Sequence, residues 1–363
     1  TKGPIAILIP GFVSFVFFGV IRREWGAWFR CVLDPVGIAL FLVIAGPWYY
    51  LHYDAQGQGF IEGFFLEHNV GRFQSAMEDH SGPIFYYIPF MLIGFLPFVA
   101  ILVRMFIRSS GELREDFVQF GLIWFGFVFV FFSIAATKLP HYVVYGYTPL
   151  FVLMALYHQD VRKDFWLFLP AMIACLLLAF LPEIGWLALS LDLVGDAYSI
   201  LVMERSLGEV GLDYRLPALL AAAFFALLMI QGMMSRTLKL YIAGLALSLF
   251  VSFALIPQVT RITQDPVKIA ALFAREQGLR VIMWKFYWPT FVFYYQDLVE
   301  KRPIPDFLAQ GKNPLLGEVV LAKETDLRHL GTYETLYSDK GVVLVRVTRM
   351  ERDDYVRMFT KGN

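Results

Sequence analysis

Long apolar runs separated by short polar connections make up the first 257 residues of the chain. The hydrocarbon core of a bilayer is about 30 Å thick, and a helix needs about 20 residues to cross it. Eight runs come close to this length or exceed it. They predict eight membrane-spanning helices, near residues 4–20, 35–53, 83–107, 117–136, 142–157, 165–190, 216–234 and 240–257.

After residue 257 the pattern changes to short alternating elements. "DPVKIAALFAREQG" predicts a helix that begins at an Asp N-cap with Pro at the first helical position and ends at Gly278, with apolar residues at 267, 270, 271 and 274. β-branched runs in "LRVIMWKFY", "GEVVLAKE" and "GVVLVRVTR" predict strands, and "TFVFYYQDLV" predicts another helix. We therefore expect a transmembrane domain over 1–257 and a small α/β domain over 258–363.

The composition is that of a polytopic α-helical membrane protein. Hydrophobic residues make up 58% of the chain and aromatic residues 17%, and the mean hydropathy is +0.59, whereas apolar residues make up roughly 45–50% of soluble domains. The 31 basic and 31 acidic residues balance, so no net field would attract nucleic acid. Cys31 and Cys175 have neither zinc-site spacing nor a disulfide framework, and we predict both to be core residues.

Basic residues gather in alternate connections, and this orients the helices because cytoplasmic loops are enriched in Lys and Arg. The basic connections lie at 22–30, 104–114, 162–163 and 236–239. The intervening 54–82 loop, the "KLPH" turn, the 191–215 loop and the C-terminal domain are therefore expected on the extracytoplasmic side. The amino terminus is expected there too, and because it lacks an initiator methionine we expect the chain to be part of a longer protein.

The first extracytoplasmic loop, "GFFLEHNVGRFQSAMEDHSGPIFYY", mixes aromatic and charged residues. If residues 60–73 are helical, Phe64, His68 and Arg72 lie on one face. An arginine can bind phosphate with two hydrogen bonds, and a histidine can bind a metal. The alternative stays open that these residues are interfacial anchors with no chemistry attached, since membrane-surface loops routinely carry aromatic and charged side chains.

The "KLPH" turn is too short to leave the membrane surface. An ionisable group at that depth is costly, so Lys138 is expected to face a cavity or an anion such as a lipid phosphate. Lys2, at the outer edge of the first predicted span, occupies the same layer. Together with Arg72, His68 and His141, the two lysines predict a binding site for an anionic headgroup.

Six segments carry a resemblance to a known family. "TKGPIAILIPG", "GPWYY", "FFLEHNVGRF", "HSGPIFYYIPFMLIGFLPF", "FFSIAATKLPHYVVYGYTPLFVL" and "FYWPTFVFYYQ" occur in the order and spacing found in lipid A aminoarabinose transferase-like proteins. The chain is similar to this branch of the polyprenyl- and dolichyl-phosphate-sugar glycosyltransferases. The resemblance implies a GT-C fold followed by a periplasmic α/β domain, with the eight predicted helices as the last eight of that fold.

The same resemblance implies roles for individual residues. The general base is expected to be an aspartate upstream of Thr1, so none is named in this chain. Glu67 and His68 would help to ligate a divalent metal ion. The carrier-phosphate and cavity residues would be Lys2, Arg72, Lys138, His80, His141 and Tyr142.

The expected function is therefore a glycosyltransferase of the inner membrane. It would move a sugar from a polyprenyl-phosphate carrier to a lipid A-like or protein acceptor on the extracytoplasmic face, in contact with membrane lipids. Two alternatives remain: a non-catalytic module that binds or transports the lipid carrier, and an enzyme like the O-antigen ligases or polymerases. The sequence does not fix the donor sugar or the acceptor.

Overall fold

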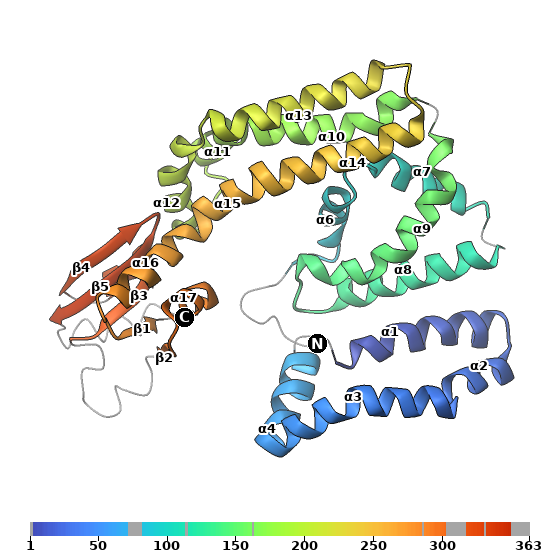
Figure 1. Ribbon diagram of the computed structural model, residues 1–363, viewed down its shortest axis with the longest axis horizontal. Helices are drawn as coiled ribbons and strands as arrows, with labels where there is room; N and C mark the ends of the chain where they lie inside the picture. The colour runs from blue at the N-terminus through green and yellow to red at the C-terminus, as the bar shows by residue number, and fades with distance from the viewer. Residues whose placement is uncertain are drawn as a thin grey trace. The chain divides into compact units, whose positions relative to one another are not determined.

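The computed structural model describes residues 3–71, 82–112, 115–161, 163–284, 287–302, 317–329 and 332–349. The side chains of 67–70, 301–302, 328–329 and 349 are outside this description. The chain forms two compact units, residues 1–170 and 171–363 (Figure 1).

The first unit begins with apolar helices. α1 (Ile5–Ser14) continues into η1 (Phe15–Ile21), and α2 (Trp25–Val32) leads into α3 (Pro35–Gln56). The carboxylate of Asp34 caps α3 by accepting a hydrogen bond from the Gly37 backbone at 2.7 Å, and Pro35 occupies the first helical position. Together α2 and α3 form an apolar helical stretch of 32 residues, and none of the residues in either helix is buried.

Shorter helices complete this unit. α4 (Gln58–Phe60) leads into the π-helix η2 (Ile61–Gly71). α6 (Tyr87–Gly94) and α7 (Val99–Ser109) meet at a bend of 115°. After α8 (Asp116–Ile134) come the 3₁₀-helix η3 (Pro140–Gly146), α9 (Tyr147–Tyr157) and η4 (His158–Asp160), and α10 (Asp164–Ala179) crosses the boundary between the units.

One apolar cluster joins four of these elements. α1, α6, α8 and η3 contribute its buried members, Ile9, Val13, Tyr87, Val128, Phe132, Tyr142 and Val143. Gly146 lets η3 approach α8 closely, since a Cβ there would lie 3.3 Å from side-chain atoms of Phe125 and Val128. The "KLPH" segment, between α8 and η3, is thereby held against α1 and α6.

The second unit has a helical part and an α/β part. The helical part contains α11 (Leu181–Ser190), α12 (Ala197–Ser206), η5 (Leu207–Glu209), α13 (Leu212–Ile230) and α14 (Arg236–Phe250). α14 continues through η6 (Val251–Leu255) into α15 (Ile256–Thr263), which makes a membrane-length helix of 28 residues. α13 and α14 run side by side (Figure 1).

The α/β part begins with α16 (Asp265–Glu276), β1 (Val281–Trp284) and α17 (Pro289–Tyr295). β2 (Glu300–Arg302), β3 (Val319–Lys323), η7 (Glu324–His329), β4 (Thr332–Asp339) and β5 (Val342–Arg349) follow. The five strands form one sheet in the order β2-β1-β3-β5-β4. β1 pairs parallel with β2 and β3, whereas β5 pairs antiparallel with β3 and β4.

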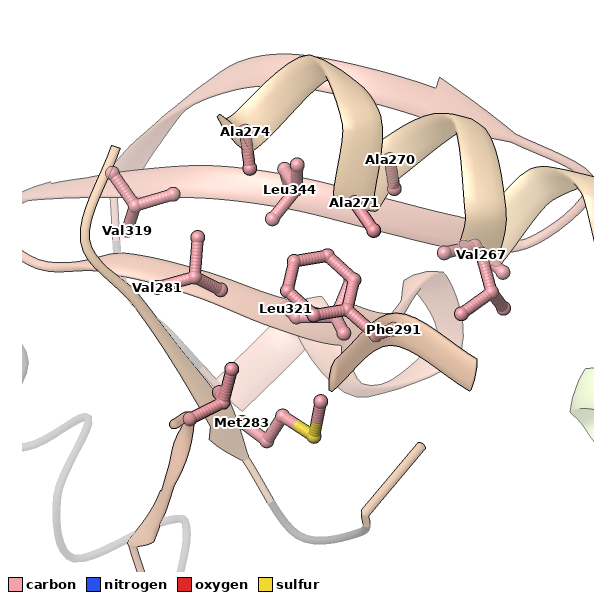
Figure 2. Packing of buried hydrophobic residues seen from close by; sticks show 12 residues of the cluster. Val267, Ala270, Ala271, Ala274, Val281, Met283, Phe291, Val319, Leu321 and Leu344 are labelled. Atoms are coloured by element: carbon pink, nitrogen blue, oxygen red, sulfur yellow. The ribbon is translucent and has the colours of Figure 1, made fainter. Parts of the chain in front are cut away.

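Helix α16 covers one face of this sheet with small side chains (Figure 2). Its residues Val267, Ala270, Ala271 and Ala274 are at most 1% exposed and pack over Leu344 and its neighbours. Alternate strand residues, including Ile282 and Trp284, build a second buried cluster on the other face. The sheet therefore has an apolar core on both faces.

The predicted α/β elements are confirmed at the helix over 265–278 and at the three strand runs. Two details of the prediction are wrong. The N-cap of α16 is Gln264 instead of Asp265, and the helix over "TFVFYYQDLV" ends at Tyr295. Cys175 is buried as predicted, but Cys31 is exposed, because α2 has no buried residue. The domain boundary at 257/258 and its extracytoplasmic side stay predictions.

The described residues contain four helices long and apolar enough to cross a membrane, or six if each bent pair is one span. Two of the predicted runs form shorter helices, Ile5–Ile21 and the 3₁₀/α pair over 140–157. The membrane class of the fold is thus supported, and the count of eight spans stays a prediction.

Candidate functional site: the KLPH segment

Lys138 is a buried cation at the end of α8. Its side chain is 6% exposed, and Nζ donates a hydrogen bond to the backbone oxygen of Ala135 at 2.6 Å. The last carbonyls of a helix carry partial negative charge and accept such bonds. Among the described residues the ammonium hydrogen-bonds to this neutral oxygen and faces no carboxylate.

Two further buried polar residues precede this lysine. Ser133 and Thr137 are 5% and 2% exposed, and the Ser133 hydroxyl has no hydrogen-bond partner among the described residues. A buried hydroxyl without a partner is costly. Sequence reasoning did not include these two residues, although a Ser and a Thr inside the apolar run before Lys138 are a detectable signal.

The "HSGP" segment reaches the lysine through Gly82. A Cβ on Gly82 would lie 2.7 Å from the ring of Tyr86 and 3.3 Å from Cδ of Lys138. Residue 82 therefore lies against the Lys138 stem. His80 lies outside the described residues, two positions before this contact in the sequence.

Aromatic residues line the same region. Tyr142 is buried, with its ring 5.0 Å from that of Phe132 and 4.9 Å from the imidazole of His141, which is exposed. Tyr87 is fully buried; its hydroxyl lies near the Leu139 backbone but has no hydrogen bond of good geometry with a described residue. Lys138, His141 and Tyr142 thus lie in one short segment, and their role in carrier binding stays a prediction.

Phe64, predicted to share a helix face with His68 and Arg72, lies in an aromatic cluster of α3, α4 and η2. Phe64 packs on Trp48 and stacks on Phe60, with ring centroids 5.5 and 5.3 Å apart. Gly3 has a φ of +53° and lies so close to Phe64 that a Cβ would approach the ring to 2.7 Å. Only glycine suits this position, because both the dihedral angle and the space exclude a side chain.

Several predicted site residues fall outside what can be described. Lys2 and Arg72 lie outside the described residues, as do the side chains of Glu67 and His68, whose backbone belongs to η2. The helix predicted over 60–73 is observed as a π-helix as far as Gly71. Within the described part of the chain no three His, Cys, Asp or Glu side chains are arranged so that they could hold a metal ion, and the metal site stays a prediction.

Several cations in the second unit are paired with carboxylates. Arg205 of α12 binds Glu324 of η7 through two hydrogen bonds of 2.5 and 2.6 Å, and Lys340 lies 2.8 Å from Glu209. Glu183 pairs with Arg215 at 2.6 Å. The further pair is Arg261 with Asp213.

Comparison of the sequence with curated proteins finds sugar transferases of bacteria. The undecaprenyl phosphate-alpha-4-amino-4-deoxy-L-arabinose arabinosyl transferase of Edwardsiella ictaluri is 31% identical over 167 residues, which is 45% of this chain and 29% of that protein. The same enzyme of Enterobacter sp. is 32% identical over 158 residues, 43% of this chain and 28% of that protein. The matched region thus spans less than a third of these relatives. No protein-family model matches the chain.

Comparison with solved structures gives the fold. The crystal structure of ArnT from Cupriavidus metallidurans bound to undecaprenyl phosphate matches with a TM-score of 0.64 and 21% identity, covering 96% of this chain and 67% of that one. The chain has the fold of ArnT. The predicted resemblance and the GT-C membrane fold are confirmed. The apo ArnT structure gives nearly the same TM-score, 0.63.

Proposed function

We propose that this ArnT-like chain is the part of a membrane glycosyltransferase that binds a polyprenyl-phosphate-linked sugar. The acceptor would be lipid A-like or a protein, and transfer would occur on the extracytoplasmic face of the inner membrane. The ArnT fold supports the class of protein. The observation that carries the proposal is Lys138, a buried ammonium beside a neutral carbonyl in the segment that carries the resemblance.

The reaction explains the need for such a cation. An acceptor oxygen attacks the anomeric carbon of the sugar, the bond from that carbon to the carrier phosphate breaks, and the phosphate leaves with an added negative charge. A positive charge fixed beside the phosphate stabilises this leaving group. A base must take the proton of the acceptor, and no described residue is assigned to that role.

Lys138 would donate to the phosphate with the two ammonium protons that Ala135 does not use. Tyr142 and His141 follow Lys138 in the same segment and would line the space that holds the carrier phosphate. Gly82 packs against the lysine stem, where a larger residue would press on it. Lys2, Arg72 and His80 are proposed as further carrier-binding residues, and Glu67 with His68 as ligands of a divalent metal ion.

The test compares two buried lysines in the full-length protein. Lys138→Ala should lower sugar transfer about 10- to 100-fold, because a hydrogen bond to a charged group contributes about 1.5–3 kcal/mol. Lys239 is the matched control, since it is 2% exposed and donates to the backbone oxygens of Leu228 and Gln231 at the end of α13. Lys239→Ala should retain transfer in the protein that remains folded. Equal transfer by both variants and wild type would leave Lys138 as a helix cap only.

Two measurements separate the alternatives. Binding of a polyprenyl phosphate without any transfer would favour a carrier-binding module over an enzyme. Treatment with EDTA tests the metal proposal: transfer lost on chelation and restored by a divalent cation supports it, and unchanged transfer removes it.

A further inference from the structure

A cavity of about 550 Å³ lies in the second unit, between the end of α15, the start of α16 and helix α17. Helix α16 contacts both α15 and α17 (Figure 1). The cavity is separate in sequence from the KLPH segment, and its α17 wall comes from "FYWPTFVFYYQ", one of the segments that carry the family resemblance.

Its lining combines aromatic faces with several kinds of hydrogen-bonding group. Phe293 is 73% exposed, so its ring is available for contact, and Tyr294 forms the adjacent wall. Asp265 and Lys268 bring one charge of each sign. The Lys268 ammonium lies 5.2 Å from the centroid of the Tyr294 ring, which holds that side chain over the wall.

This chemistry fits a saccharide. The negative faces of aromatic rings attract the polarised C–H groups of a sugar ring, while carboxylate, ammonium, amide and hydroxyl groups match its many hydroxyls. Gln264 and Thr290 supply the amide and hydroxyl groups and already hydrogen-bond to each other at 2.7 Å. The opposite charges of Asp265 and Lys268 cancel, which disfavours a strongly anionic ligand.

The cavity also lies at the end of a membrane-length helix. The helix Arg236–Thr263 has 28 residues, so it is about 42 Å long, longer than the hydrocarbon core of about 30 Å. The polar residues Gln258 and Arg261 are costly inside that core, so the C-terminal end of the helix extends beyond it. Thr260, on this end, lines the cavity.

We propose that the cavity between α15, α16 and α17 binds the saccharide headgroup of a membrane-anchored glycolipid. The proposal rests on the proposed function and deepens it, because it names a sugar-binding cavity within the second unit. The same chemistry serves two sources, the sugar of the donor and the sugar of the acceptor.

Binding to the full-length protein in detergent tests this directly by calorimetric titration. The probes are free 4-amino-4-deoxy-L-arabinose, the sugar in the relatives' names, and a glucosamine disaccharide. Phe293→Ala and Lys268→Gln should each raise the Kd of the bound probe about tenfold. Leu298→Ala is the matched control: its side chain is 93% exposed on the chain after α17 and does not line the cavity, so its Kd should equal that of wild type.

Binding of the aminoarabinose would assign the cavity to the donor, and binding of the disaccharide to the acceptor. No binding of either probe by wild type, or equal Kd values for Phe293→Ala and wild type, would overturn the proposal. Lys138→Ala tests the proposed function separately from the saccharide cavity. This variant should lose transfer but keep saccharide binding.

Discussion

The end of α8 and the contact between α12 and the sheet treat positive charge in opposite ways. At α8, Lys138 is 6% exposed and hydrogen-bonds to a neutral backbone oxygen. At the other contact, Arg205 and Lys340 each face a carboxylate, Glu324 and Glu209. The carboxylates neutralise Arg205 and Lys340, whereas Lys138 faces no carboxylate within the described part of the chain.

The difference teaches how to separate a structural cation from one that binds a ligand. An ion pair at the protein surface contributes about 0–1 kcal/mol and is screened by salt. A buried charge without a counter-ion is costly, and ligand binding is a common reason for keeping it. Lys239 is intermediate between these two kinds of cation. It is buried as deeply as Lys138, but it hydrogen-bonds to two carbonyl oxygens of the neighbouring helix.

The largest effect on folding is expected at Lys239. Lys239→Met removes hydrogen bonds to the oxygens of Leu228 and Gln231, and leaving buried carbonyls without partners costs about 1–3 kcal/mol. Thermal unfolding of the purified protein in detergent should show a lower Tm. Met233→Ala, at a neighbouring side chain that is 96% exposed, should leave the Tm unchanged. An unchanged Tm for Lys239→Met would show that the hydrogen bonds of Lys239 do not stabilise the fold.

Gly82 offers a smaller change that sharpens the comparison without removing a charge. In Gly82→Ala the new Cβ collides with the ring of Tyr86 and presses on the Lys138 stem. Displacing the ammonium should lower transfer about 10-fold, equivalent to about 1.4 kcal/mol. Gly126→Ala is the control, since a Cβ there meets no atom within 4 Å. Full transfer by Gly82→Ala would show that the position of Lys138 is not critical.

The Arg205 and Glu324 pair should contribute to stability and not to transfer. A double-mutant cycle with Arg205→Ala and Glu324→Gln should give a coupling energy of about 0.5–1 kcal/mol, because both side chains are partly exposed. The coupling should shrink at high salt, and each variant should transfer sugar at the wild-type rate. A tenfold loss of transfer in either variant would contradict the division between the two regions.

The smallest effect is expected at Asp196, the N-cap of α12. Hydrogen bonds from the Ser199 side chain and backbone lower the pKa of Asp196. Its stabilising contribution is therefore complete above the unfolded pKa of about 3.9 and is lost as the pH falls through the lower folded value. Asp196→Asn keeps a capping side chain but should remove this part of the pH dependence of the Tm. A Tm difference between the two proteins that stays constant down to pH 3 would count against it.

Hydropathy predicted the elements whose whole length is apolar. The runs over 117–136 and 216–234 correspond to Asp116–Ile134 and Leu212–Ile230, because the run is the helix. The long runs over 83–107 and 165–190 are each bent, by 115° and 66°, and hydropathy does not respond to a change in direction. Pro97 and Pro182 stand at these bends, and a proline is a local sequence feature that indicates a break in a helix.

The two strands that the sequence did not predict are the two edges of the sheet, β2 and β4. An edge strand lacks a neighbour on one side and has no need for a continuous buried run, so "EKR" and "TYETLYSD" have no strong apolar pattern. For the site, the sequence predicted Lys138, His141 and Tyr142 as carrier-binding residues, and this role stays a prediction. The sequence could not show that Lys138 hydrogen-bonds to Ala135 or touches Gly82, since both contacts depend on how α8 ends.

The most direct test of the central claim is binding of undecaprenyl phosphate to the full-length protein in lipid nanodiscs. Wild type, Lys138→Ala and Lys239→Ala are compared at the same ionic strength. We expect Lys138→Ala to raise the Kd at least about tenfold, because it removes a charged hydrogen bond, and Lys239→Ala to leave it unchanged. Equal Kd values for all three proteins would contradict the assignment of Lys138 to the carrier phosphate.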